Sequence, residues 1–118
     1  MAPHSLPNNF GDEMNGISTL SLSELRIEAE EAERKHGPTH TLSNPDMPIV
    51  EKLAALGEEC GEVMELFTYD KFPHIEKLPT IAEHLAAVEE WRDNLMKELL
   101  QVANVAMTWR DSVRRGGN

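Results

Sequence analysis

Four glutamates at positions 58, 59, 62 and 65 lie within an apolar helical pattern without interrupting it. At about 100° per residue, one narrow stripe of this stretch is apolar, as in a helix that packs against other helices. Glu58 and Glu65 point away from that stripe, whereas Glu59 and Glu62 lie beside it. The members of the stripe, which we call the first seam, are Ile49, Leu53, Leu56, Cys60, Val63 and Phe67.

A second seam with the same spacing lies near the C-terminus, and Glu98 and Gln101 run beside it. If the two helices pack antiparallel through their seams, Glu59 and Glu62 can face Gln101 and Glu98. Carboxylates this close raise each other's pKa and repel unless a cation lies among them. Oxygen ligands without a histidine cluster favour Mg²⁺, or Mn²⁺, over zinc. The second seam comprises Leu95, Leu99, Val102, Ala106, Trp109 and Val113.

The motif Glu58-Glu59-x-x-Glu62 followed by Glu98-x-x-Gln101 resembles the two-part signature of the MazG-like, all-α nucleoside triphosphate pyrophosphohydrolases. The wider strings 51–63 and 97–109 are similar to small bacterial and phage members. The resemblance implies hydrolysis of a nucleoside triphosphate to the monophosphate and pyrophosphate. It implies that Glu59, Glu62 and Glu98 hold Mg²⁺ with help from Gln101, and that Glu58 or Glu59 assists the attacking water.

Gln101 departs from the family pattern, because most members have an aspartate ligand there. An amide oxygen can coordinate, but it gives up one negative charge, so we expect weaker metal binding or a ligand drawn from Glu58. Asn104 lies further from the seam and is not expected to substitute. Two other interpretations stay open: a family member that binds nucleotide without hydrolysing it, and a helical scaffold whose carboxylates face solvent.

Three basic side chains are candidates for substrate binding. His36 and His40 belong to a polar, Gly-containing connection that could line a nucleotide pocket, although a helix end and a solvated loop would look the same. Lys52 lies on the acidic side of its helix and could meet a phosphate, or could simply be solvated. Trp91 and Trp109 could stack on a base, but Trp109 falls on the second seam and fits a core position better.

Composition restricts the partners. Acidic residues outnumber basic ones by 21 to 11, which gives a net charge of −10 and argues against nucleic-acid and anionic-membrane surfaces. A phosphorylated substrate would therefore need metal to approach. Cys60 is the single cysteine, so no internal disulfide can form, and its seam position suits a small apolar filler. Without a long apolar run or a signal-like N-terminus, we expect a soluble, cytoplasmic protein.

These elements predict an all-α antiparallel bundle of three to four helices, completed by assembly into a homodimer or homotetramer. Residues 1–20 should form an extended arm and 21–115 the helical domain. The first helix is expected over 21–36 from a Ser21/Glu24 capping box, and the second over 47–69 with Asp46 as its cap. A loop is expected over 69–79. A Thr80/Glu83 capping box should then start a helical pattern that continues to Arg114, with a kink or a break into two helices near 92–94.

Overall fold

A computed structural model describes residues 16–118, apart from the side chains of Pro38 and Ile75. In this part of the chain there are three α-helices, two short 3₁₀ turns and no strands, so the predicted all-α class is confirmed. The predicted arm lies largely outside the described residues. The elements are α2 (Thr19–His36), η2 (Pro38–His40), α3 (Ile49–Glu65), η3 (Ile75–Lys77) and α4 (Ile81–Arg114).

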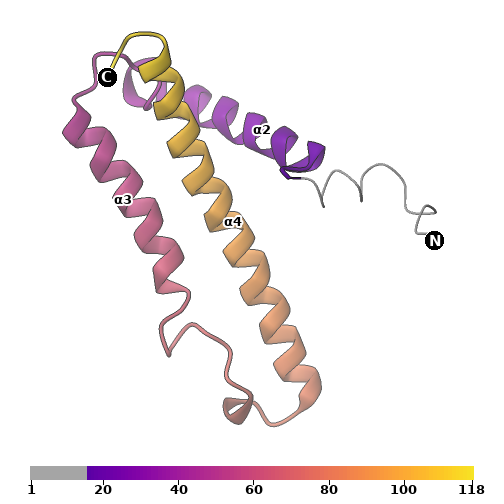
Figure 1. The fold of residues 1–118 in the computed structure, drawn as a ribbon. Coiled ribbons are helices and arrows are strands. Elements are labelled where there is room, and N and C mark those ends of the chain that lie inside the picture. The colour runs from indigo at the N-terminus through magenta and orange to yellow at the C-terminus, as the bar shows by residue number, and fades with distance from the viewer. Residues whose placement is uncertain (1–15) are drawn as a thin grey trace.

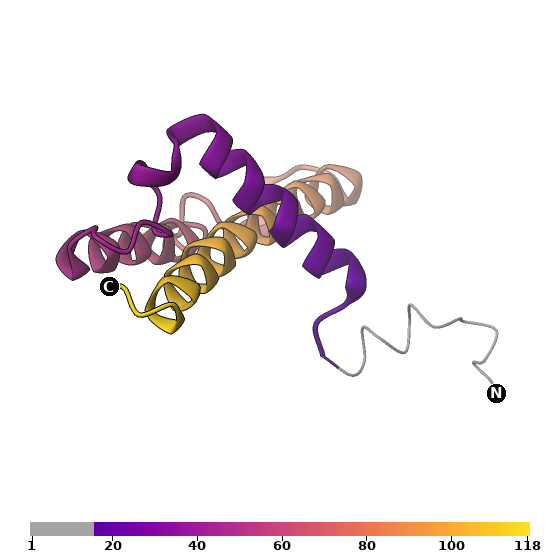
Figure 2. The same ribbon diagram turned by 90° about the horizontal axis from the view of Figure 1, so that it is seen from above.

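The helices α3 and α4 run antiparallel side by side, and α2 crosses α4 on one face of that pair (Figures 1 and 2). The molecule is flat, with principal extents of 52 × 41 × 21 Å. Within residues 16–118, no helix covers the opposite face of the α3–α4 pair (Figure 2). None of the described helices has an apolar run long enough to cross a bilayer.

The helix α2 starts earlier than predicted. Ser18 is its N-cap, with a side-chain oxygen that accepts a hydrogen bond from Ser21 N at 3.0 Å. The predicted Ser21/Glu24 capping box is therefore wrong, because Ser21 already lies inside the first turn. The predicted end is correct: Gly37 adopts a φ of 81°, which favours glycine, and its N–H donates to Glu33 O.

The helix α3 is shorter than predicted at both ends. Asp46 does not cap it, because the helix starts after Pro48, two residues further on, and Asp46 lies in a local turn in which its N–H donates to Asn44 Oδ1. At the other end the hydrogen bonds shift to the tighter i to i+3 pattern from Leu66 onward. The Thr68 hydroxyl donates to Glu65 O at 2.9 Å and satisfies one of the terminal carbonyls.

The helix α4 is continuous for 34 residues, so the predicted kink near 92–94 is wrong. Thr80 caps it as predicted, since its hydroxyl accepts from Glu83 N at 3.1 Å. The kink was inferred from a change in apolar phase between Leu85 and Leu95. A straight helix tolerates this change of phase because Ile81 and Leu85 are 74% and 61% exposed. Neither side chain has to lie on the same buried face as the later apolar residues.

Both seams are more exposed than antiparallel packing through them would allow. Among the described residues, no hydrophobic side chain is fully buried. Leu53 and Leu99, the second residue of each seam, are 59% and 49% exposed, whereas Leu56 and Val102 are half-buried. Between α3 and α4 an open groove of about 440 Å³ is lined by Leu56 and Trp109 among others. The seams thus border an open face rather than filling a closed core.

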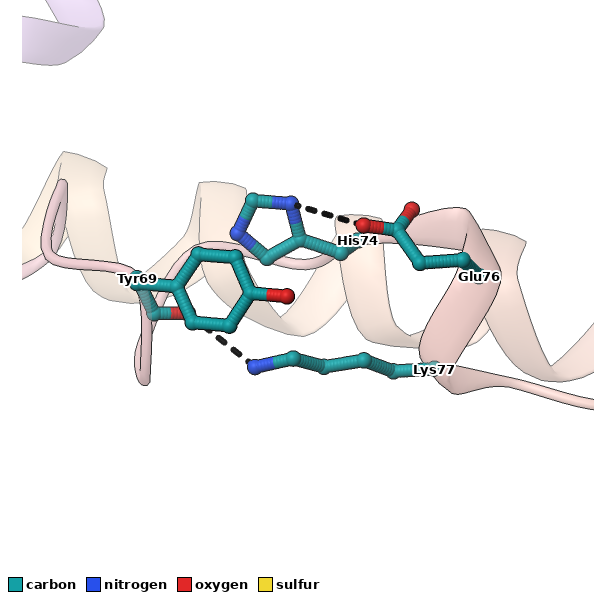
Figure 3. A network of polar contacts seen from close by, with 4 residues as sticks. All are labelled: Tyr69, His74, Glu76 and Lys77. Carbon is teal, nitrogen blue, oxygen red and sulfur yellow. Dashed lines mark hydrogen bonds and ion pairs between the residues drawn. The ribbon is translucent and has the colours of Figure 1, made fainter.

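The connection between α3 and α4 sets their spacing with an aromatic cluster. Trp91 of α4 makes edge contacts with Phe67 and Phe72, with ring centroids 5.2 and 5.0 Å apart, and its Nε1 donates to Leu66 O at 2.7 Å. Figure 3 shows the neighbouring polar contacts of this loop: Lys77 lies over the Tyr69 ring, which stacks on His74, and His74 pairs with Glu76.

Candidate metal centre

Three carboxylates from two helices converge between α3 and α4. One oxygen each from Glu59, Glu62 and Glu98 lies within 4.8 Å of the other two, and we call this group the acid cluster. Glu59 and Glu62 are one helical turn apart on α3, so both reach the same side, and the antiparallel α4 brings Glu98 opposite them. The predicted meeting of these three residues is therefore present in the fold.

The acid cluster is electrostatically unfavourable without a cation. The pKa of Glu59 is raised, first by burial and then by the charges of Glu62, Glu98, Glu58 and Glu28. A hydrogen bond to Glu98 raises the pKa of Glu62, and partial burial adds to it. Glu59 Oε2 and Glu98 Oε2 are inaccessible to solvent and have no hydrogen-bond partner. Buried carboxylate oxygens are normally paired, so two unpaired ones within a group of three neighbouring carboxylates favour the binding of a cation there.

A pocket of about 240 Å³ opens beside the acid cluster between α2, the α2–α3 connection and α4. We call it the polar pocket, and Glu59 belongs to its wall. It brings together three predicted site residues with Glu59, namely Gln101, His36 and His40. Both histidines are exposed, and His40 Nδ1 lies 3.0 Å from Thr39 Oγ1. Gln101 thus faces the site, as its helical phase predicted.

Two of the predicted site residues belong neither to the acid cluster nor to the pocket wall. Glu58 is exposed next to Glu59, close enough for its charge to act on Glu59. Lys52 is fully buried, and its Nζ donates to Ser112 Oγ at 2.9 Å and to Asn118 O at 3.1 Å. The Lys52 ammonium is therefore hydrogen-bonded within the protein, and it is not available to bind a phosphate.

Two residues that the helical patterns do not indicate, Asn104 and Glu28, contribute to the site. Asn104 is buried on the pocket wall and its Oδ1 accepts from Thr108 Oγ1 at 3.3 Å. Asn104 lies away from the second seam, and the pocket lies on that side of α4. Glu28 of α2 is half-buried, and its charge acts on Glu59. A third helix therefore reaches the site, which no pairing of two helical patterns could reveal.

The donor set suits a hard divalent cation. Three carboxylates within 4.8 Å, an amide nearby and no histidine in the cluster match the oxygen coordination of Mg²⁺ or Mn²⁺ better than that of zinc. The adjoining polar pocket offers histidine, hydroxyl and amide groups to a polar ligand. No protein-family model, curated protein or solved structure matches this chain.

Proposed function

We propose that this chain is a Mg²⁺-dependent nucleoside triphosphate pyrophosphohydrolase, with Mn²⁺ as a possible substitute. The observation that carries the proposal is the acid cluster, in which one oxygen of each carboxylate lies within 4.8 Å of the other two, and in which Glu59 and Glu98 each have a buried, unpaired oxygen. Its position at the edge of a polar pocket supports a metal that serves a ligand rather than one that only stabilises the fold. The resemblance of the Glu58–Glu62 and Glu98–Gln101 motifs to MazG-like enzymes supports the reaction class.

Glu59, Glu62 and Glu98 would hold the cation, with the Gln101 amide oxygen assisting. A bound divalent ion supplies charge neutralisation for the triphosphate and lowers the pKa of water. This chain needs that neutralisation, because its net charge of −10 repels a triphosphate. Exposed Glu58, adjacent to Glu59 in the sequence, would accept a proton from the attacking water.

The polar pocket would bind the remainder of the nucleotide. His36 and His40 can donate to phosphate or sugar oxygens, and the hydroxyl of Thr108 and the amide of Asn104 can bind sugar or base. At about 240 Å³ the pocket is smaller than most sites for a ligand of nucleotide size, which fits a ligand that extends out of it toward the acid cluster.

A second candidate function is nucleotide binding without hydrolysis, and Gln101 favours it. The neutral amide beside Glu59 leaves the site one negative charge short of the family pattern. Weaker metal binding would lower turnover more than nucleotide affinity if the pocket groups hold the nucleotide by themselves. A scaffold role is disfavoured by the buried, unpaired oxygens of Glu59 and Glu98, because solvated surface carboxylates would be accessible.

We further propose that the open face of the α3–α4 pair packs against a second copy of the chain. The half-exposed seams make an apolar strip along both helices, with Ile49, Leu53, Phe67 and Val113 all between 55% and 59% exposed. Exposed apolar strips of this extent are unusual on monomers and typical of subunit interfaces. Two such pairs packed face to face would make a four-helix bundle.

The test of the proposed function is identification of products. Purified protein is incubated with Mg²⁺ and each of the common ribo- and deoxyribonucleoside triphosphates, and the products are separated by anion-exchange chromatography. The expected products are monophosphate and pyrophosphate, abolished by chelation of Mg²⁺. Mg²⁺-dependent nucleotide binding without products would favour the sensor, and the absence of both binding and turnover would refute a nucleotide site.

A further inference from the structure

The connection between α2 and α3, residues 37–48, forms one wall of the polar pocket through residues 40–43. Its internal hydrogen bonds are local. Asn44 N donates to Thr41 O at 3.0 Å, and Met47 N donates to Asn44 O at 3.3 Å. Local turns of this kind preserve the shape of a loop but do not fix its position against a neighbouring helix. Other contacts must hold this wall against α4, which supplies the facing side.

Asn118, in the segment that follows α4, provides such contacts. Its backbone N–H donates to Pro45 O at 3.0 Å, and its side-chain amide donates to Met47 O at 3.2 Å. The Arg115 guanidinium donates to Ser43 O at 3.4 Å. Within residues 16–118, these bonds join the connection to the segment that follows α4, and Figure 1 shows that segment beside the start of α3.

The buried ammonium of Lys52 joins α3 to the same segment. Its Nζ donates to Ser112 Oγ on α4 at 2.9 Å and to the Asn118 backbone oxygen at 3.1 Å. Trp109 Nε1 donates to that oxygen at 3.0 Å. A fully buried lysine is costly unless its hydrogen bonds are made, so this arrangement favours one position of Asn118 over all others.

Gly117 lets the backbone come close enough for these bonds. Its N–H donates to Ser112 O at 3.0 Å, and a Cβ at this position would overlap the Pro45 ring and lie 2.7 Å from Pro45 Cα. Any other residue would push the segment away from the connection. The close approach is therefore specific to glycine at position 117.

We propose that Lys52, Gly117 and Asn118 form a clamp that positions residues 37–48 as a wall of the polar pocket. These are positioning residues: they set nucleotide affinity through the wall and do not touch the nucleotide. The link to nucleotide affinity rests on the proposed function, whereas the clamp itself rests on the contacts above. The clamp also accounts for a lysine that is fully buried and bound to Ser112 and Asn118.

The test uses the full chain with K52M, which keeps the apolar stem and removes the ammonium, and G117A, which introduces the overlap with Pro45. The matched control is K71M, because Lys71 is exposed in the other connection. Hydrogen exchange followed by mass spectrometry reports on residues 38–48, and steady-state kinetics with the best triphosphate reports on the pocket. Mn²⁺ affinity without nucleotide reports on the acid cluster.

In K52M and G117A, amides within 38–48 should exchange about tenfold faster while those in the middle of α3 and α4 keep their rates. The KM should rise about tenfold, with kcat changed less than about twofold and Mn²⁺ affinity unchanged. K71M should behave as the parent in all three measurements. G117A keeps the test valid if K52M fails to fold.

Unchanged exchange within 38–48 in folded G117A would overturn the clamp. Faster exchange with an unchanged KM would overturn its role in positioning the pocket wall. If the parent shows neither Mn²⁺ binding nor turnover, the proposed function fails, and the exchange comparison alone then decides the clamp. Equal loss of Mn²⁺ affinity and of nucleotide affinity would indicate general disruption and would also overturn the positioning role.

Discussion

Replacing Glu59 with Gln should stabilise the metal-free protein while it destroys metal binding. Two unit charges at 4.8 Å, the upper limit in the acid cluster, repel by roughly 1 kcal/mol in water and roughly 3.5 kcal/mol at an effective dielectric constant of 20. Glu59 is only half-buried, so the lower value applies. The amide introduced by E59Q can also donate to the remaining carboxylates. A gain of about 1 kcal/mol corresponds to a rise in Tm of roughly 4 °C.

The assay is thermal unfolding at pH 8 with and without Mg²⁺. A hundredfold excess of Mg²⁺ over Kd should stabilise the parent by roughly 2.7 kcal/mol, and E59Q should show almost none of this gain. E65Q is the matched control, because Glu65 lies on the same helix, is exposed and stands outside the acid cluster. If E59Q and E65Q behave alike with and without Mg²⁺, the carboxylates are ordinary surface groups and the reasoning fails.

Three further outcomes follow from the same geometry. Because the pKa values of Glu59 and Glu62 are raised, the native metal-free state binds more protons than the unfolded state just above the ordinary carboxyl pKa, so stability should rise as pH falls from 7 to about 5. Urea unfolding across that range checks this, and a flat or falling profile contradicts it. Q101D restores a charge beside Glu59 and should tighten Mg²⁺ binding roughly tenfold by calorimetry, whereas equal affinity would place residue 101 outside the site. Light scattering at micromolar concentration should show a dimer or tetramer that L53E dissociates, and a monomeric parent would refute packing through the seams.

The acid cluster could be predicted because helical periodicity fixes which side chains share a face. Glu59 and Glu62 lie one turn apart on α3, and the antiparallel α4 brings Glu98 opposite them, although the two seams are not packed against each other. The apolar periodicity of each helix, read over about twenty residues, is enough to identify the face on which these glutamates lie. Whether the cluster holds a metal stays a prediction.

Other parts of the fold depend on contacts between distant residues, which no local pattern reveals. Lys52 looks like an ordinary flank residue until Ser112, 60 positions away, is placed beside it. Asn104 lies away from the second seam, yet it lines the polar pocket, because no residue of that seam belongs to the pocket wall. The structure turns the seams toward the open face, and Leu53 is 59% exposed there. An apolar stripe identifies a face for packing but does not identify which partner covers it.

The predicted helix starts were wrong where more than one nearby polar residue could have acted as the N-cap. Ser18 and Ser21 are both acceptable caps, and the earlier one wins because its oxygen binds Ser21 N and adds two residues to α2. Asp46 has the right chemistry for a cap, but it lies in a turn with Asn44 and the helix starts two residues later, after Pro48. Thr80 had no nearby competitor, and its prediction as the cap of α4 is confirmed.

The most direct test of the proposed activity is pyrophosphate release under Mg²⁺ by the parent, E62Q and E65Q, measured on the best triphosphate of the panel. The proposed function predicts release of one pyrophosphate per monophosphate by the parent and by E65Q, loss of at least about a hundredfold in E62Q, and no release without divalent ion. Equal release by all three proteins, or release that survives chelation, would show that the acid cluster of Glu59, Glu62 and Glu98 is not the catalytic metal site.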